Sequence, residues 1–136
     1  MDLMKSMMIA ASGLKAQSGR MRVIAENLAN ANSTAKTPGG DPYRRKIPTF
    51  KAEFDRALDA QVVSLGRITQ DKTEFTTRYD PNHPAADTKG YVKMPNVNSL
   101  IETVDMREAQ RSYEANLNVI TSARRMVSRT LDILRG

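Results

Sequence analysis

The chain has 136 residues, a length that suits one domain. It contains no cysteine, which excludes disulfide bonds and thiol chemistry, and no stretch carries the roughly 20 apolar residues needed to cross a bilayer. The formal net charge of +6 leaves nucleic acid, an acidic membrane face and an acidic protein as candidate partners. Aromatic residues are only 5% of the chain, so we expect a small aliphatic core.

Residues 1–31 carry an apolar repeat that is typical of a packed helix. Its members alternate spacings of four and three: Leu3, Met7, Ala10, Leu14, Gln17, Met21, Ile24, Leu28 and Ala31. Asp2 suits the start of this helix. It also interrupts the basic segment that a signal peptide needs, so we expect no cleavage. Gly13 and Gly19 lie off the repeat and either face solvent or admit a neighbouring backbone.

Residues 32–98 predict loops, a short helix and a small β region. Asn, Ser, Thr, Gly and Pro are concentrated between Asn27 and Pro42, a composition that ends a helix and builds turns. Phe50, Phe54 and Leu58 are spaced by four, which predicts a short helix with one apolar face. β-Branched and aromatic residues predict two or three strands, in Val62–Ile68, Glu74–Tyr79 and Gly90–Pro95.

The stretch from Ser99 to Leu134 has no proline or glycine and predicts a second long helix. Ser99 and Glu102 form a capping-box pattern at its start. The helix carries two apolar rows: Met106, Tyr113, Leu117, Ile120, Val127, Leu131 and Leu134 in the first, and Ala109, Val119, Ala123, Met126 and Ile133 in the second. One row would serve one partner helix, so two rows predict a helix packed on two sides, partly by other chains.

These patterns predict a mainly α fold. Long N- and C-terminal helices, in residues 1–31 and 99–136, pack as a coiled-coil-like pair, and residues 32–98 insert a small β element and a short helix between them. Two helices with one row each would close as a hairpin within a monomer, but the second C-terminal row is left over. Packing among neighbouring subunits accounts for it better.

Candidate catalytic and metal sites are weak. Asp80, His83 and Asp87 could bind a metal, but they lie in a proline-rich turn without ligand spacing. No nucleophile–base pair is apparent, and Gly39-Gly40 is not a phosphate loop. We therefore expect no enzyme activity, no cofactor and no metal. A basic helical module that binds nucleic acid remains the alternative, and a membrane-surface helix is disfavoured because neither helix has a consistently cationic face.

Three motifs resemble those of one family. Glu26-Asn27-Leu28-Ala29-Asn30-Ala31-Asn32-Ser33, Gly90-Tyr91-Val92-Lys93-Met94-Pro95-Asn96-Val97-Asn98 and Arg111-Ser112-Tyr113-Glu114-Ala115-Asn116-Leu117 are similar to motifs of the bacterial flagellar rod and hook proteins, the second to those of the proximal rod. The chain departs from the family at Lys36-Thr37-Pro38-Gly39, which runs into Gly40-Asp41-Pro42-Tyr43 rather than directly into tyrosine.

The resemblance implies a structural subunit of the flagellar basal-body proximal rod, without enzymatic activity or cofactor, that transmits motor torque. Implied partners are other rod subunits and further copies of the chain in a tubular assembly, and the flagellar type III export apparatus. The implied location is the periplasmic rod, reached without a cleaved signal.

Assembly would then depend on the terminal helices. The residues that we expect at the assembly interface are Leu14, Met21, Ile24, Asn27, Leu28 and Asn30 in the first helix, and Tyr113, Asn116, Leu117, Ile120, Val127 and Leu131 in the second. Arg124 interrupts the first row of the second helix, at a point where the row reaches solvent or an acidic partner.

Overall fold

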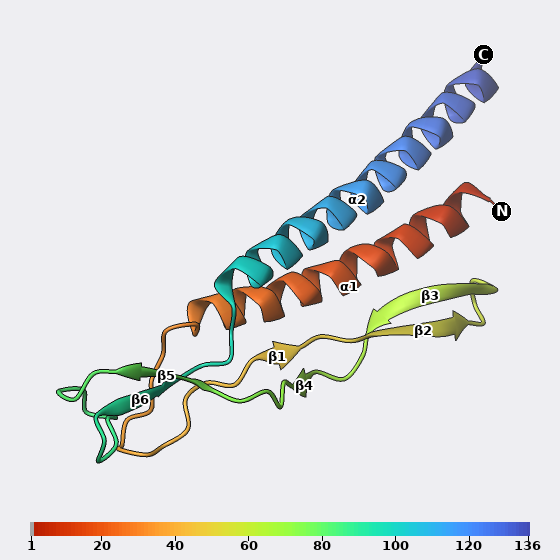
Figure 1. Cartoon of the computed structure of the whole chain (residues 1–136). Coiled ribbons are helices and arrows are strands. Elements are labelled where there is room, and N and C mark those ends of the chain that lie inside the picture. The colour runs from red at the N-terminus through yellow and green to blue at the C-terminus, as the bar shows by residue number, and fades with distance from the viewer. Residues whose placement is uncertain (1) are drawn as a thin grey trace. The chain divides into compact units, whose positions relative to one another are not determined.

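The computed structural model describes residues 2–136 and contains two long helices and three two-stranded sheets (Figure 1). The helices are α1 (Leu3–Ala29) and α2 (Ser99–Arg135). The strands between them are β1 (Lys46–Ile47), β2 (Phe50–Asp55), β3 (Ala60–Leu65), β4 (Thr69–Gln70), β5 (Thr76–Tyr79) and β6 (Tyr91–Met94). All three pairings are antiparallel: β1 with β4, β2 with β3, and β5 with β6.

The prediction of a mainly α fold is wrong. The helices have 27 and 37 residues, so more than half of the chain lies outside them, and six strands replace the expected two or three. The two terminal helices and the β region between them agree with the prediction only in part.

The expected short helix at Phe50–Leu58 is β2, which pairs with β3 over six positions from Phe50–Leu65 to Asp55–Ala60. A helix of so few residues has little stability of its own, whereas β3 supplies partners for the whole strand. The connecting turn is built by Asp55, whose Oδ1 accepts hydrogen bonds from the amides of Ala57 and Leu58. Asp59 completes it at a φ of 50°.

Both long helices begin at a capping side chain. The amide of Lys5 donates a hydrogen bond of 2.6 Å to Asp2 Oδ1, as expected. In α2 the cap is Asn98, whose Oδ1 accepts from the amides of Leu100 and Ile101 at 3.1 and 3.3 Å. The predicted capping box of Ser99 and Glu102 is therefore wrong, because the carboxylate of Glu102 is bound elsewhere.

The chain divides into two compact units, and each long helix contributes one part to each. The first unit comprises Met1–Met21, Pro48–Arg67 and Arg107–Gly136. The second comprises Arg22–Ile47 and Ile68–Met106.

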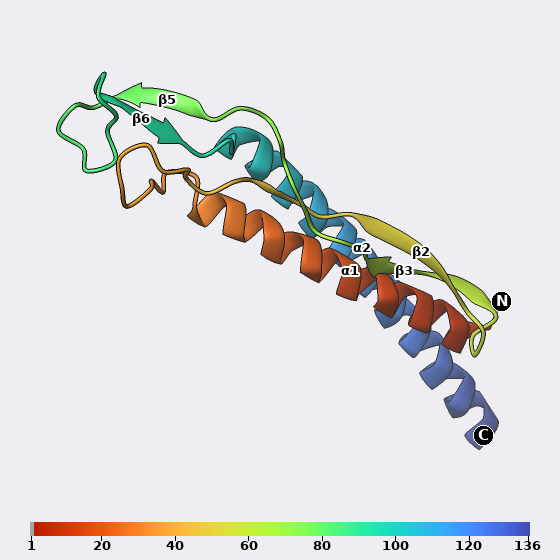
Figure 2. The same cartoon turned by 90° about the horizontal axis from the view of Figure 1, so that it is seen from below.

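Small residues form the buried core of the first unit. Ala10, Ala16, Ala109 and Ala123 are at most 5% exposed. A Cβ on Gly13 of α1 would lie 2.7 Å from Asn116 Nδ2 of α2, and one on Gly19 would lie 2.7 Å from Leu65 Cδ2 of β3. Figure 2 shows the β2–β3 hairpin alongside α1. Both glycines therefore allow a neighbouring element to approach α1 closely, and the atoms that come close belong to side chains rather than to the backbone.

The second unit buries Val23, Ile24, Ala31, Ala85 and Val92. Its β5–β6 hairpin holds Tyr79 edge-on to Tyr91, with ring centroids 5.3 Å apart. Gly90 directly precedes β6 at a φ of 86°, and a Cβ there would lie 3.0 Å from the Tyr79 ring. Only glycine combines this conformation with this contact, so the first residue of the Gly90–Asn98 motif is required by geometry.

The contact between Gly13 and Asn116 can be tested with a double-mutant cycle. Gly13→Ala should add helix propensity worth about 0.8–1 kcal/mol, but in the wild-type chain it must displace the Asn116 amide. We expect Gly13→Ala to raise the free energy of unfolding in an Asn116→Ala background, and to raise it less or lower it with Asn116 present. Equal effects in the two backgrounds, measured by urea unfolding, would rule out the contact.

Candidate assembly interface

The second unit is held together by a buried carboxylate. Glu102 is 1% exposed and belongs to the first turn of α2. Its Oε1 accepts a hydrogen bond from Arg45 Nε, and its Oε2 accepts one of 3.2 Å from Asn27 Nδ2. Arg45 also approaches Asp71 at 3.4 Å and Asp105 at 3.9 Å. A buried charge that lost its partner would destabilise the fold by about 3–5 kcal/mol, so this ion pair fixes the positions of both segments.

Asn27 links α1 to the segment that follows it. The side chain is fully buried, and its Oδ1 accepts hydrogen bonds from the Lys46 amide at 3.0 Å and the Tyr43 hydroxyl at 2.7 Å. Its Nδ2 donates to the Lys46 carbonyl at 2.8 Å as well as to Glu102. One amide side chain thus satisfies both backbone groups of Lys46, as a neighbouring strand would.

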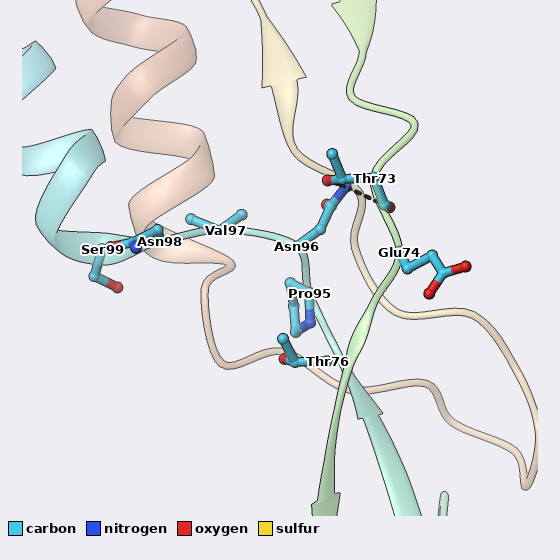
Figure 3. A pocket seen from close by; sticks show the side chains of 8 residues that line it. All are labelled: Thr73, Glu74, Thr76, Pro95, Asn96, Val97, Asn98 and Ser99. Atoms are coloured by element: carbon cyan, nitrogen blue, oxygen red, sulfur yellow. Dashed lines mark hydrogen bonds between the residues drawn. The ribbon is translucent and has the colours of Figure 1, made fainter.

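Asn96 makes a second link of the same kind. Its Oδ1 accepts from the Arg45 amide at 2.7 Å, and its Nδ2 donates to the carbonyls of Asp71 and Thr73 at 3.0 and 3.2 Å. Figure 3 shows Asn96 directed at Thr73 in the pocket that residues 73–76 form with the segment joining β6 to α2. The Gly90–Asn98 motif therefore combines a turn glycine, a bridging amide and the α2 cap.

The ionisable groups of this network are shifted in consistent directions. Burial raises the pKa of Tyr43 to about 12, with smaller contributions from the carboxylates of Glu26 and Glu102. For Arg45, burial acts to lower the pKa, but the hydrogen bonds and charges of Glu102 and Asp71 outweigh it and raise the pKa. Hydrogen bonds from Thr73 and then from Arg45 lower the pKa of Asp71.

The predicted interface residues of α1 lie in both units. Leu14, Met21 and Leu28 are half-buried, and Ile24 is 2% exposed. Asn30 donates to the Glu26 carbonyl at 2.9 Å, which satisfies one of the last carbonyls of the helix. Asn27 and Asn30, two of the three asparagines of the Glu26–Ser33 motif, therefore bind groups of their own chain.

The two predicted rows of α2 combine into one face toward α1 within the first unit. Ala109 and Ala123 from the second row are buried, whereas Tyr113, Ile120 and Val127 from the first row are half-buried. Asn116 lies between them against Gly13 and donates to the Ser112 carbonyl at 3.1 Å. The other members in this unit are uncovered. Four flank this face, namely Leu117 44%, Leu131 50%, Val119 47% and Met126 55% exposed, and two lie in the last turn of α2, namely Ile133 79% and Leu134 78% exposed.

Two grooves follow these flanks in the first unit. The first groove is lined by Met4, Met7, Arg124, Val127, Ser128 and Leu131. The second groove is lined by Leu3, Ser6, Asn118, Val119, Ser122, Ala123 and Met126. Each groove has one wall from α1 and one from α2, so each could receive a further helix.

Sequence reasoning missed the centre of the polar network. Arg45 received no role from the sequence, and Glu102 was predicted as part of a capping box. The position of Glu102 could have indicated its burial. It precedes Ala109 by seven residues and therefore lies on the same face of the helix as that apolar row.

No membrane-crossing or metal-binding element accompanies the interface within residues 2–136. Neither helix is long and apolar enough to span a membrane. In the same residues, no three metal-ligating side chains converge. His83 accepts a hydrogen bond at Nδ1 from the Ala85 amide at 3.0 Å, which gives the single histidine a role within its turn.

The buried ion pair should dominate the stability of the second unit. Arg45→Ala leaves Glu102 buried without its charge partner, and we expect a loss of about 3–5 kcal/mol in the free energy of unfolding. Lys93→Ala removes an ion pair with Asp41 in which both side chains are exposed, and it should cost at most about 1 kcal/mol. Similar losses in urea unfolding would contradict the special role of Arg45.

The raised pKa of Tyr43 gives a second test. Because the folded chain holds the phenol proton more tightly, the stability from this group is complete below pH 10 and falls as the pH rises toward about 12. Ultraviolet absorbance should show one of the four tyrosines ionising in that upper range. Tyr43→Phe should remove this late phase, and Tyr79→Phe, at an exposed position, should leave it.

Comparisons with known proteins point to one family. Residues 7–35 match the family described as flagella basal body rod protein, and residues 88–133 match the C-terminal family of flagellar basal body rod FlgEFG proteins. The flagellar basal-body rod protein FlgC of Agrobacterium fabrum is 54% identical over 94% of this chain and 92% of its own length. FlgC of Borreliella burgdorferi is 42% identical over the whole of both chains. FlgC of Bacillus subtilis is 37% identical over 98% of this chain and 99% of its own. The chain therefore belongs to the FlgC family of flagellar basal-body rod proteins, and it is a structural rod subunit rather than an enzyme.

Proposed function

We propose that the chain takes its place in the proximal part of the rod through the uncovered flanks of its helix pair, and there transmits motor torque. The observation that carries the proposal is that α1 covers only part of the apolar surface of α2. One face is occupied by α1, while Leu117 and Leu131 on one flank and Val119 and Met126 on the other stay about half exposed. Apolar side chains aligned along a helix in this way are typical of an interface with other chains.

The predicted interface residues take two roles in this proposal. Leu117 and Leu131, with half-buried Tyr113, Ile120 and Val127, would contact neighbouring rod subunits directly. Half-buried Leu14, Met21 and Leu28 would do so from α1. The remaining predicted residues would support the interface indirectly, through contacts within the chain that fix the helices: Ile24, Asn27, Asn30 and Asn116.

We infer that the chain reaches the periplasmic rod through the flagellar type III export apparatus without cleavage. Leu3 and Met7 belong to α1 and line the two grooves, so cleavage of a leader there would remove part of the interface. The first unit has a core made largely of alanines, which favours a chain that orders fully only after it docks. Nothing in the fold or the comparisons supports the nucleic-acid alternative.

Leu117→Asp tests the assembly surface. Leu117 is 44% exposed, so the variant should remain soluble and exported. In the rod it would bury an unpaired carboxylate at a cost of several kcal/mol, and rods should not form. Leu117→Met is the matched control, because it keeps the apolar volume and should swim normally. Secretion assays, swimming and basal-body preparations give the readout, and normal rods with Leu117→Asp would overturn the proposal.

A further inference from the structure

The C-terminal end of α2 carries apolar side chains beyond those that α1 covers. The first groove pairs Met4 and Met7, near the start of α1, with Val127 and Leu131 of α2. The helix then continues to Arg135, and Ile133 and Leu134 in its last turn are 79% and 78% exposed. Leu134 follows Val127 by seven residues and so continues the α1-facing side of α2. The first groove and this last turn form one open apolar surface, which we call the open end.

The charged residues in the C-terminal part of α2 are mainly cationic. From Ala115 to Gly136 the chain has four arginines, Arg124, Arg125, Arg129 and Arg135, against one carboxylate, Asp132. Arg124 lines the first groove itself. Within residues 2–136, none of the ion pairs includes any of these four arginines. The α1 segment Leu3–Met21 adds three cations and no carboxylate.

A second copy of the chain is a poor occupant for this surface. Among residues 2–136, only α1 and α2 could supply a helix, and the α1 segment Leu3–Met21 is itself cationic. Three of the five carboxylates of α2 are already engaged: Glu102 and Asp105 with Arg45, and Glu108 with Arg20. Packing two copies here would bring arginines toward lysines and arginines at close range, which is unfavourable.

We propose that the open end binds an acidic amphipathic helix of a different rod subunit, whose apolar row fills the first groove against Leu131 and Leu134 while its carboxylates pair with Arg124 and Arg135. This inference rests on the proposed function, because it assigns a partner chemistry to one end of the same assembly surface. Apolar contact supplies affinity, and the unpaired arginines select the partner.

The direct test uses the full-length chain and two synthetic amphipathic helices of about five turns each. Both peptides carry the same leucine row, flanked by glutamates in one and by lysines in the other. Fluorescence anisotropy at low salt should show at least about tenfold tighter binding of the glutamate peptide, and the difference should shrink at about 0.5 M salt. Equal affinities, or no binding of either peptide, would overturn the proposal.

Variants of the chain assign the selectivity to the open end. Arg124→Glu should abolish or reverse the preference for the glutamate peptide. Arg107→Glu makes the same charge change at an exposed position about four to five turns earlier in α2, and it should keep the preference. Leu131→Ser with Leu134→Ser should weaken both peptides equally, with circular dichroism confirming intact helices. Retained selectivity in Arg124→Glu would place the site elsewhere and refute the inference.

The second-copy alternative has its own readout. Analytical ultracentrifugation of the chain alone should show a monomer, or self-association that persists in the Leu131→Ser, Leu134→Ser variant. Self-association that this double variant abolishes would refute the proposal of a different, acidic partner. Failure here is separable from failure of the proposed function. Lost peptide selectivity alongside rod-deficient Leu117→Asp would overturn only the partner assignment, whereas normal rods with Leu117→Asp would overturn the assembly surface itself.

Discussion

The buried carboxylate of Glu102 is the constraint on which the second unit depends. It is the largest of the fully buried side chains in the described residues, in a chain whose buried apolar residues are alanines, valines and one isoleucine. A carboxylate is buried without loss only when its partners are in place, so Arg45 and Asn27 must be positioned before this unit is complete. The first turn of α2, the end of α1 and the segment at β1 are therefore energetically coupled.

The first unit is stabilised by different means. Its buried residues are alanines, and Gly13 and Gly19 allow Asn116 and Leu65 to approach α1 closely. Alanine side chains bury little apolar area, so the hydrophobic contribution to stability is modest, and close packing has to supply the rest. The polar network thus specifies the arrangement of one unit, while the other depends on close packing of small residues.

Sequence patterns predicted those parts of the fold that depend on local signals. The apolar repeats from Leu3 to Ala31 and from Ser99 to Leu134 indicated both helices, since a helical periodicity over many turns rarely arises by chance in other secondary structure. The segment Phe50–Asp55 was misassigned because two patterns overlap there: Phe50, Phe54 and Leu58 have a helical spacing, while Phe50, Ala52 and Phe54 alternate with charged residues as in a strand. Pairing with β3 decides between the two. The partners of Glu102 were missed for a related reason: a contact across 57 residues leaves no local pattern.

The two apolar rows of α2 have a different meaning in the structure than their separate spacings suggested. A helix cannot bury two full rows against one partner, so α1 takes the residues where the rows adjoin, and the small side chains Ala109 and Ala123 set the distance. The larger members Leu117, Leu131, Val119 and Met126 are then left on the flanks at about half exposure. Larger residues at 109 and 123 would widen the helix pair and change the shape of both flanks. The alanines that hold the pair together therefore also determine the surface that a neighbouring subunit would meet.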